Sequence, residues 1–151
     1  MQALQEPPVI DIEQLYHFVI GLRGGDLSVR LPIDGGGRAT EIAVHLNRFA
    51  ADIQTLLSEM KRISEEISEG RFGGQLQIAL PPGPWRDAVE AMNRMEWDIT
   101  NQIRDCVATS ARLAAGSIDR PVTAPCRGET KALGDNLNAI RARMDLGAKA
   151  G

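Results

Sequence analysis

The 151-residue sequence contains few side chains with the type and spacing that catalysis requires. Neither of its two histidines, His17 and His45, is followed by the acidic residue and downstream proline that accompany a phosphoacceptor histidine. The glycine run at 35–37 precedes Arg38, not the Lys-Ser/Thr pair of a phosphate-binding loop. No Ser/His/Asp set and no catalytic carboxylate pair is present. We therefore expect exposed helical histidines, no cofactor and no enzymatic activity.

Four further side chains could in principle hold a metal or a flat cofactor. Cys106 and Cys126 have no Cys or His partner at metal-ligand spacing, so no metal site is expected. Cys106 lies on an apolar stripe, which favours a buried, inert thiol in a reduced, cytoplasmic chain. Trp85 also lies on the apolar stripe and Trp97 follows Met95 by two residues, which favours packing and partial exposure over cofactor binding.

The composition favours a helical protein that acts in water. Apolar residues make up 43% of the chain but aromatic residues only 4%, which is typical of helical bundles. A net charge of −3 with scattered basic residues argues against nucleic acid as a partner. The sequence has neither the long apolar run of a membrane span nor the basic start of a signal peptide, so no membrane contact is expected in this segment.

A long helix is predicted over Ala39–Glu69, because its apolar residues recur every three or four positions without an intervening proline or glycine. Such a narrow stripe requires a helical partner. Further helices are expected over about Asp11–Arg23, from Pro84 to just before Gly116, and over about Glu129–Met144. Residues 147–151 are expected to be a frayed tail.

Three kinds of position repeat along the chain with a period of 45 or 46 residues. The helix-ending glycines are Gly25, Gly70 and Gly116. The repeated asparagines are Asn47, Asn93 and Asn138. Apolar anchors follow each glycine by two and by six residues: Leu27 and Leu31, Phe72 and Leu76, Ile118 and Val122. The chain is therefore expected to contain three units, at 10–56, 57–102 and 103–147.

Each predicted unit is a helix, a connector of 13–14 residues and a second helix. A connector of this length can return along a whole helix, so the two helices of a unit are expected to be parallel. Two helices cannot enclose a core, which predicts an all-α homodimer of stacked parallel four-helix bundles joined by continuous helices. The predicted dimer core is Ile12, Leu15, Leu22, Ile42, Leu46, Phe49, Ile53, Leu57, Met60, Ile63, Ile67, Ala88, Met92, Met95, Ile99, Ile103, Cys106, Leu113, Leu133, Leu137, Ile140 and Met144.

The apolar spacing changes phase where one unit meets the next. Across both junctions the steps are four, four and three residues, which is a stutter in a heptad pattern and locally unwinds the supercoil. The two series are Phe49, Ile53, Leu57, Met60 and Met95, Ile99, Ile103, Cys106. We expect a conformational signal to cross at these junctions.

The repeated asparagines lie next to the apolar stripe. Their amides are suited to pair connector backbone groups that would otherwise be buried without a partner, although they could also simply be solvated. Under the first interpretation, Asn47, Asn93 and Asn138 are candidate switch residues.

Over residues 10–146 the pattern resembles tandem HAMP domains, the relay modules of chemoreceptors, sensor histidine kinases and some cyclases. The resemblance rests on Gly-x-apolar steps at the ends of first helices and apolar-Asn-x-apolar steps in second helices. The steps are Gly25-Asp26-Leu27, Gly70-Arg71-Phe72 and Gly116-Ser117-Ile118, then Leu46-Asn47-Arg48-Phe49, Met92-Asn93-Arg94-Met95 and Leu137-Asn138-Ala139-Ile140. The acidic residue that opens the family's second helix is present as Glu129 but is replaced by Arg38 and Pro84 in the other units.

The resemblance implies a non-enzymatic, cytoplasmic signal relay in chemotaxis or two-component signalling. Its partners would be a second copy of the chain, an upstream sensor and a downstream output domain, and Glu129 would take part in switching. Two alternatives remain open from the residues alone. One is a dimeric coiled-coil spacer that does not switch, and the other is a monomeric up-and-down bundle.

Overall fold

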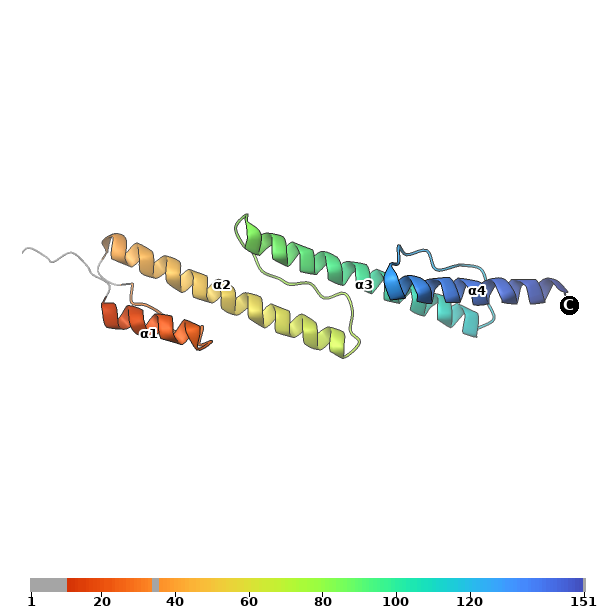
Figure 1. The fold of residues 1–151 in the computed structure, drawn as a ribbon, viewed down its shortest axis with the longest axis horizontal. Helices are drawn as coiled ribbons and strands as arrows, with labels where there is room; N and C mark the ends of the chain where they lie inside the picture. Colours follow the sequence, from red (N-terminus) through yellow and green to blue (C-terminus); the bar gives the residue numbers. More distant parts are fainter. Residues whose placement is uncertain (1–10, 34–35, 151) are drawn as a thin grey trace, which may run out of the picture. The chain divides into compact units, whose positions relative to one another are not determined.

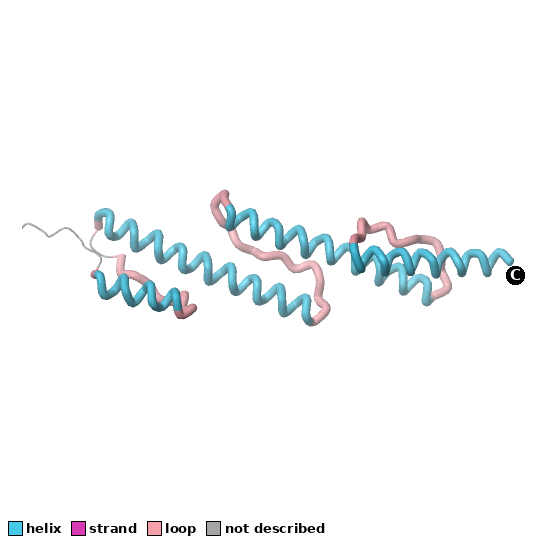
Figure 2. The backbone as a smooth tube through the Cα atoms, in the orientation of Figure 1, coloured by secondary structure: helices cyan, strands magenta, loops and turns pink. Residues whose placement is uncertain are grey.

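The computed structural model describes residues 11–33 and 36–150 (Figure 1). Within these ranges the chain forms four helices and no strand, so the expected all-α class is confirmed. The helices are α1 (Ile12–Arg23), α2 (Gly37–Ser68), α3 (Pro84–Ala114) and α4 (Gly128–Ala150). Non-helical connectors join them (Figure 2). Among the described residues, no helix combines the length and the apolar character needed to cross a membrane.

The helix boundaries follow local signals in the sequence. Asp11 is the N-cap of α1, where its carboxylate accepts a hydrogen bond of 3.0 Å from the backbone N–H of Glu13. Pro84 occupies the first turn of α3, as expected for a residue that lacks an N–H. The expected frayed tail is wrong: α4 continues to Ala150, and an i,i+4 pair of 2.7 Å between Lys149 and Asp145 stabilises its last turns.

The three repeated helix-ending glycines adopt the left-handed backbone conformation that ends a helix. Their φ angles are +85° at Gly25, +77° at Gly70 and +79° at Gly116. At Gly116 the glycine N–H donates to the carbonyl of Leu113, and the N–H of Ser117 donates to the carbonyl of Arg112. This pair of bonds is a Schellman motif, which satisfies carbonyls at the helix end and turns the chain back along the helix.

The contacts divide the chain into two compact units. The first contains the described residues up to Glu69 together with Leu76–Arg86, and the second contains Gly70–Gln75 and the described residues from Asp87 onward. This division does not test the expected three-unit boundaries, which stay a prediction. Within the first unit, α1 and the first half of α2 run in the same direction (Figure 1), as expected for parallel helices.

The first compact unit has an apolar core between α1, its connector and α2. Phe18 of α1 is 2% exposed and packs with Leu31 of the connector and with Ala43 and Ala50 of α2. Gly21 lets the connector approach α1 closely, because a Cβ there would lie 2.9 Å from a methyl group of Val29. The connector is therefore a packed layer of the fold rather than a loose loop.

The second compact unit buries a more polar set of side chains. In the part of the chain that the structure describes, the buried side chains of this unit lie on α3. Three of them, Glu96, Thr100 and Thr109, are polar. The end of α3 runs in the same direction as the start of α4 (Figure 1), and the Thr130 hydroxyl of α4 donates a hydrogen bond to the Gln102 side chain of α3. The parallel arrangement of first and second helices thus recurs in this unit.

Replacing a helix-ending glycine should destabilise the protein through the backbone alone. A Cβ at Gly116 would meet no atom within 4 Å, so Gly116→Ala tests only the cost of φ +79° for an L-residue. We expect a loss of about 1–2 kcal/mol in the free energy of unfolding, measured by urea denaturation. The control is Gly147→Ala, at a helical glycine whose Cβ position is also open. This control should be neutral or stabilising by up to about 1 kcal/mol, and equal losses in both variants would contradict the prediction.

Candidate functional site

The repeated asparagines hold the connectors by paired hydrogen bonds. The Asn47 side chain accepts from the backbone N–H of Leu31 at 2.8 Å and donates to the carbonyl of the same residue at 2.8 Å. Asn138 forms the same pair with Val122, at 2.9 and 3.3 Å. The backbone groups of these anchors are partly buried, so an unpaired group there would be costly. The expected contact between asparagine and connector backbone is confirmed at these two positions, whereas their role in switching stays a prediction.

Two carboxylates, one on α2 and one on α3, bind the connector residue that directly follows a buried or half-buried anchor. The carboxylate of Glu59 accepts from the backbone N–H of Gln77 at 2.8 Å. Asp105 accepts from the N–H groups of Thr123 at 2.6 Å and Ala124 at 2.7 Å. We refer to these bonds, with those of Asn47 and Asn138, as the connector contacts. Each connector involved is therefore bonded by the side chain of a helix at its anchor.

Sequence reasoning missed the two carboxylates, although the repeat contained the signal. Glu59 and Asp105 each stand eleven residues before a helix-ending glycine, and Gln77 and Thr123 each stand seven residues after it. At the corresponding places the first repeat has Gln14 and Pro32. Proline has no N–H to donate, so the carboxylate and its donor are absent from that repeat together. The repeated spacing of carboxylate and donor indicates a contact only when the connector is known to return along its helix.

The electrostatics of both carboxylates favour the ionised form. A hydrogen bond from Arg62, followed by the bond from Gln77, lowers the pKa of Glu59 to about 2. Burial alone would raise the pKa of Asp105, but the hydrogen bonds from Ala124 and Thr123 and the charge of Arg120 outweigh it, and the net pKa is lowered. Both connector contacts are thus made by charged acceptors, which strengthens a hydrogen bond to a backbone N–H.

The position three residues after each asparagine has different chemistry in each repeat. In the first repeat it is the buried Ala50. In the second it is Glu96, 3% exposed, whose carboxylate accepts from the Gly73 N–H at 2.6 Å and from Thr100 at 2.9 Å. In the third it is Arg141, which donates to the Ile118 carbonyl at 3.1 Å. The units are therefore chemically distinct beneath the same connector path.

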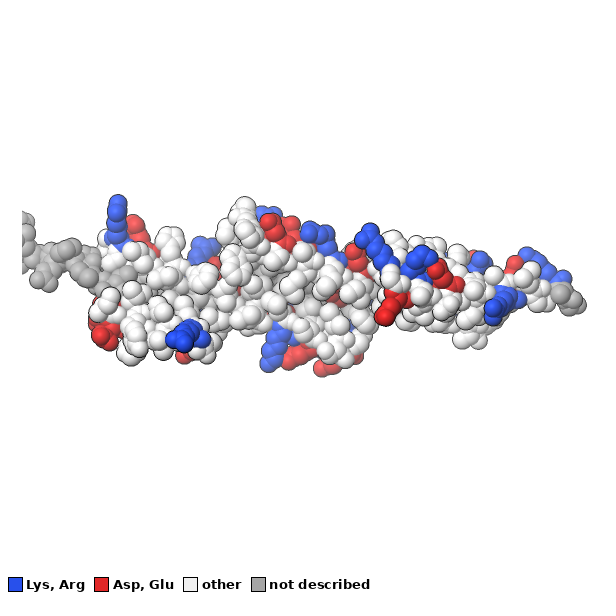
Figure 3. Space-filling view, viewed as in Figure 1, with Lys and Arg blue, Asp and Glu red and all other residues white. Residues whose placement is uncertain are grey.

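Most of the predicted dimer-core residues retain exposed surface in the single chain. The exposed ones are Ile12, Ile42, Phe49, Leu57, Ala88, Met95, Ile99, Leu133 and Ile140. The half-buried ones are Leu15, Leu22, Leu46, Ile53, Met60, Ile67, Met92, Ile103, Leu113, Leu137 and Met144, while Ile63 and Cys106 are buried. On the face drawn in Figure 3, side chains of both charges are interspersed among wide uncharged areas. The single chain therefore leaves much of the predicted apolar stripe uncovered.

The remaining predicted site residues occupy three kinds of environment. Among the connector anchors, Leu31 and Leu76 are buried, while Leu27, Phe72, Ile118 and Val122 are half-buried. Asn93 is half-buried on α3. Glu129 is exposed in the first turn of α4. The expectation of exposed histidines is confirmed for both His17 and His45.

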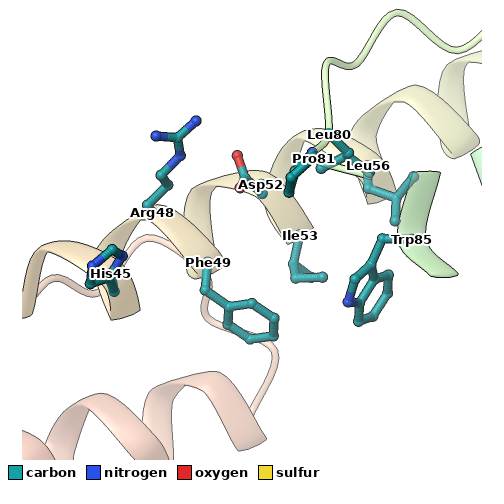
Figure 4. A pocket seen from close by; sticks show the side chains of 9 residues that line it. All are labelled: His45, Arg48, Phe49, Asp52, Ile53, Leu56, Leu80, Pro81 and Trp85. Atoms are coloured by element: carbon teal, nitrogen blue, oxygen red, sulfur yellow. The ribbon is translucent and has the colours of Figure 1, made fainter. Parts of the chain in front are cut away.

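A pocket of about 310 Å³ lies in the first compact unit, at the predicted junction. Phe49, Ile53 and Trp85 form its apolar side, and Arg48 and Asp52, which point to the opposite side of α2 in Figure 4, also line it. Phe49 and Trp85 are 47% and 54% exposed and make an edge-to-face contact with ring centroids 6.5 Å apart. The packing and partial exposure expected for Trp85 are thus observed, and the apolar surface remains open.

No protein-family model matches the sequence, and no solved structure matches the chain.

Removing an asparagine of the connector contacts should cost more than removing an exposed asparagine nearby. Asn138→Ala leaves the N–H and carbonyl of Val122 without their partner, so we expect a loss of about 1–3 kcal/mol in the free energy of unfolding. The control is Asn136→Ala, at an exposed position of the same helix. Urea denaturation measures both, and equal losses would show that the connector bonds contribute nothing measurable.

The Asp105 contact should make stability depend on acid pH. Its pKa is lower in the folded than in the unfolded chain, so its contribution is complete above about pH 4 and decreases as the pH falls below that value. The urea midpoint of the unaltered protein should fall between about pH 6 and pH 3 by more than that of Asp105→Asn. Asp98→Asn, at an exposed position of α3, is the matched control. A fall as large in Asp105→Asn as in the unaltered chain would refute this assignment.

Proposed function

We propose that this chain is a non-enzymatic signal relay built from three HAMP-like units. In this proposal it acts as a parallel homodimer and passes a conformational change from an upstream sensor to a downstream output domain of the chemoreceptor or histidine-kinase type. The observation that carries the proposal is the set of connector contacts. In the third repeat, Asp105 of α3 and Asn138 of α4 both bond the connector backbone, so movement of either helix would displace the connector and act on the other helix.

The exposed apolar stripe supports the dimer. On α2, Ala43 and Ala50 pack in the core with α1, while their neighbours Ile42 and Phe49 are exposed. The two pairs have the same seven-residue spacing, so α2 carries two adjacent apolar faces. A second copy of the chain would cover the outer face of each unit and complete a four-helix bundle.

The proposed relay works through two packings of similar energy. Small buried side chains on α3, including Cys106 and Thr109, specify a helix interface less tightly than large ones. Helix rotation or splay could then alternate between two states, and an input to one unit would bias the next through the stutter at the junction. The open pocket formed by Phe49, Ile53 and Trp85 lies at such a junction, where packing would have to change.

The dimer is tested by its mass in solution. Light scattering should give about twice the 16.4 kDa of the single chain, and Ile42→Glu or Phe49→Glu should shift the protein toward the single-chain mass, because a charge would be buried in the interface. Val44→Glu is the control, since Val44 is an exposed apolar residue of α2 outside the predicted stripe. A mass near 16.4 kDa for the unaltered chain would favour the monomeric bundle.

Relay is distinguished from a rigid spacer by placing the chain between a sensor and a kinase output. After replacement of the native cysteines, disulfides that lock facing helices in alternative registers should change kinase output in opposite directions. Deleting one predicted unit, such as 57–102, should alter the response. Unchanged output in both experiments would support a spacer without switching.

A further inference from the structure

The two cysteines of the chain lie in different elements of the second compact unit. Cys106 is on α3 and is 4% exposed. Cys126 is half-buried in the connector between α3 and α4. Both are free thiols. They therefore stand on the two parts of the fold that the connector contacts join.

Hydrogen bonds of the connector backbone hold Cys126 near the turn of α3 that carries Cys106. The residue next to Cys106, Asp105, accepts from the N–H of Ala124 at 2.7 Å. Two residues further on, the N–H of Cys126 donates to the carbonyl of Ala124 at 2.8 Å. This tight turn keeps Cys126 close to the place where the connector is bonded to α3.

A second tie lies on the other side of Cys126. Thr130, in the first turns of α4, donates its hydroxyl proton to the side chain of Gln102 on α3. Gln102 is four residues, about one helical turn, before Cys106. The segment that carries Cys126 is therefore bonded to α3 both before and after the cysteine.

The environments of the two thiols differ. Burial, followed by the Cys126 thiol, raises the pKa of Cys106, so Cys106 is held as a neutral thiol. Cys126 lines a surface pocket of about 250 Å³ beside Gly134. A Cβ at Gly134 would lie 3.9 Å from its sulfur, so the absence of a side chain there leaves room at this thiol. Access for a small reagent is therefore on the Cys126 side.

We propose that Cys106 and Cys126 are a thiol pair that closes to an intramolecular disulfide when a hydroperoxide oxidises Cys126. The Cys126 thiolate attacks the peroxide oxygen, the O–O bond breaks, and a sulfenic acid forms with release of water or an alcohol. The Cys106 sulfur then attacks the Cys126 sulfur, and the S–O bond breaks as the S–S bond forms. The hydroxide and the Cys106 proton leave together as water. A thiol reductant reverses the bond by exchange. The bond would fasten the last connector to α3 whether or not the chain dimerises.

The repeat shows that packing alone does not require sulfur at these positions. Met60 and Leu80 occupy the equivalent places in the second repeat, and Leu15 and Gly35 occupy them in the first. Only the third repeat has two thiols there. The proposed redox response is therefore confined to the last unit.

The test uses the full chain, reduced and then treated with an equimolar amount of hydrogen peroxide. The intact mass should fall by about 2 Da, both titratable thiols should be lost, and a digest without reductant should contain the Cys106–Cys126 cross-linked peptide. Dithiothreitol should restore the mass and the thiols. Amide exchange in residues 117–127 should be slower in the oxidised form than in the reduced form.

Valine variants separate the two roles. Cys106→Val should accumulate a sulfenic acid on Cys126, trapped with dimedone, and Cys126→Val should react more slowly than the unaltered chain. Formation of only intermolecular disulfides, or over-oxidation of Cys126 in the unaltered chain without loss of the Cys106 thiol, would overturn the proposal. Because the decisive readout is made on the unaltered protein, it does not depend on the folding of either variant.

Discussion

The fold depends on one constraint: an extended connector must lie along a pair of helices with its backbone polar groups satisfied. A helix pairs its own N–H and carbonyl groups, but an extended chain packed on helices cannot. The protein meets this requirement with side chains from the helices themselves. Asn47 and Asn138 pair both polar groups of an anchor residue, and Glu59 and Asp105 take the N–H of the next one. The apolar side chains of the anchors can then turn inward, as Leu31 does.

This arrangement couples three segments that would otherwise be independent. A helix pair linked by a loose loop could slide without consequence for the loop, whereas the third connector is bonded to α3 by Asp105 and to α4 by Asn138. The bonds use charged acceptors at Glu59 and Asp105, whose pKa values are lowered by the donors they bind. The first repeat, with Gln14 and Pro32, lacks the carboxylate and its donor. The units are thus alike in path but unequal in how firmly the connector is held.

The same path is supported by different chemistry beneath it. Ala50, Glu96 and Arg141 occupy one repeated position, and the last two reach opposite kinds of backbone group, an N–H and a carbonyl. A carboxylate can only accept and a guanidinium can only donate, so these residues cannot be exchanged between units without breaking a bond.

The sequence by itself determined the all-α class, the four helices, the glycines that end them and the repeated positions of the asparagines. These features depend on local conformation or on a fixed period, both of which are readable along the chain. It did not determine that Glu59 and Asp105 contact the connector, or that Cys126 is held near Cys106. Glu59 and Gln77, like Asp105 and Thr123, are 18 residues apart, and the two cysteines are 20 residues apart. These residues come near one another only because the connector returns along its helix at one particular register. Tertiary structure alone sets that register, since it follows from where the buried anchors pack.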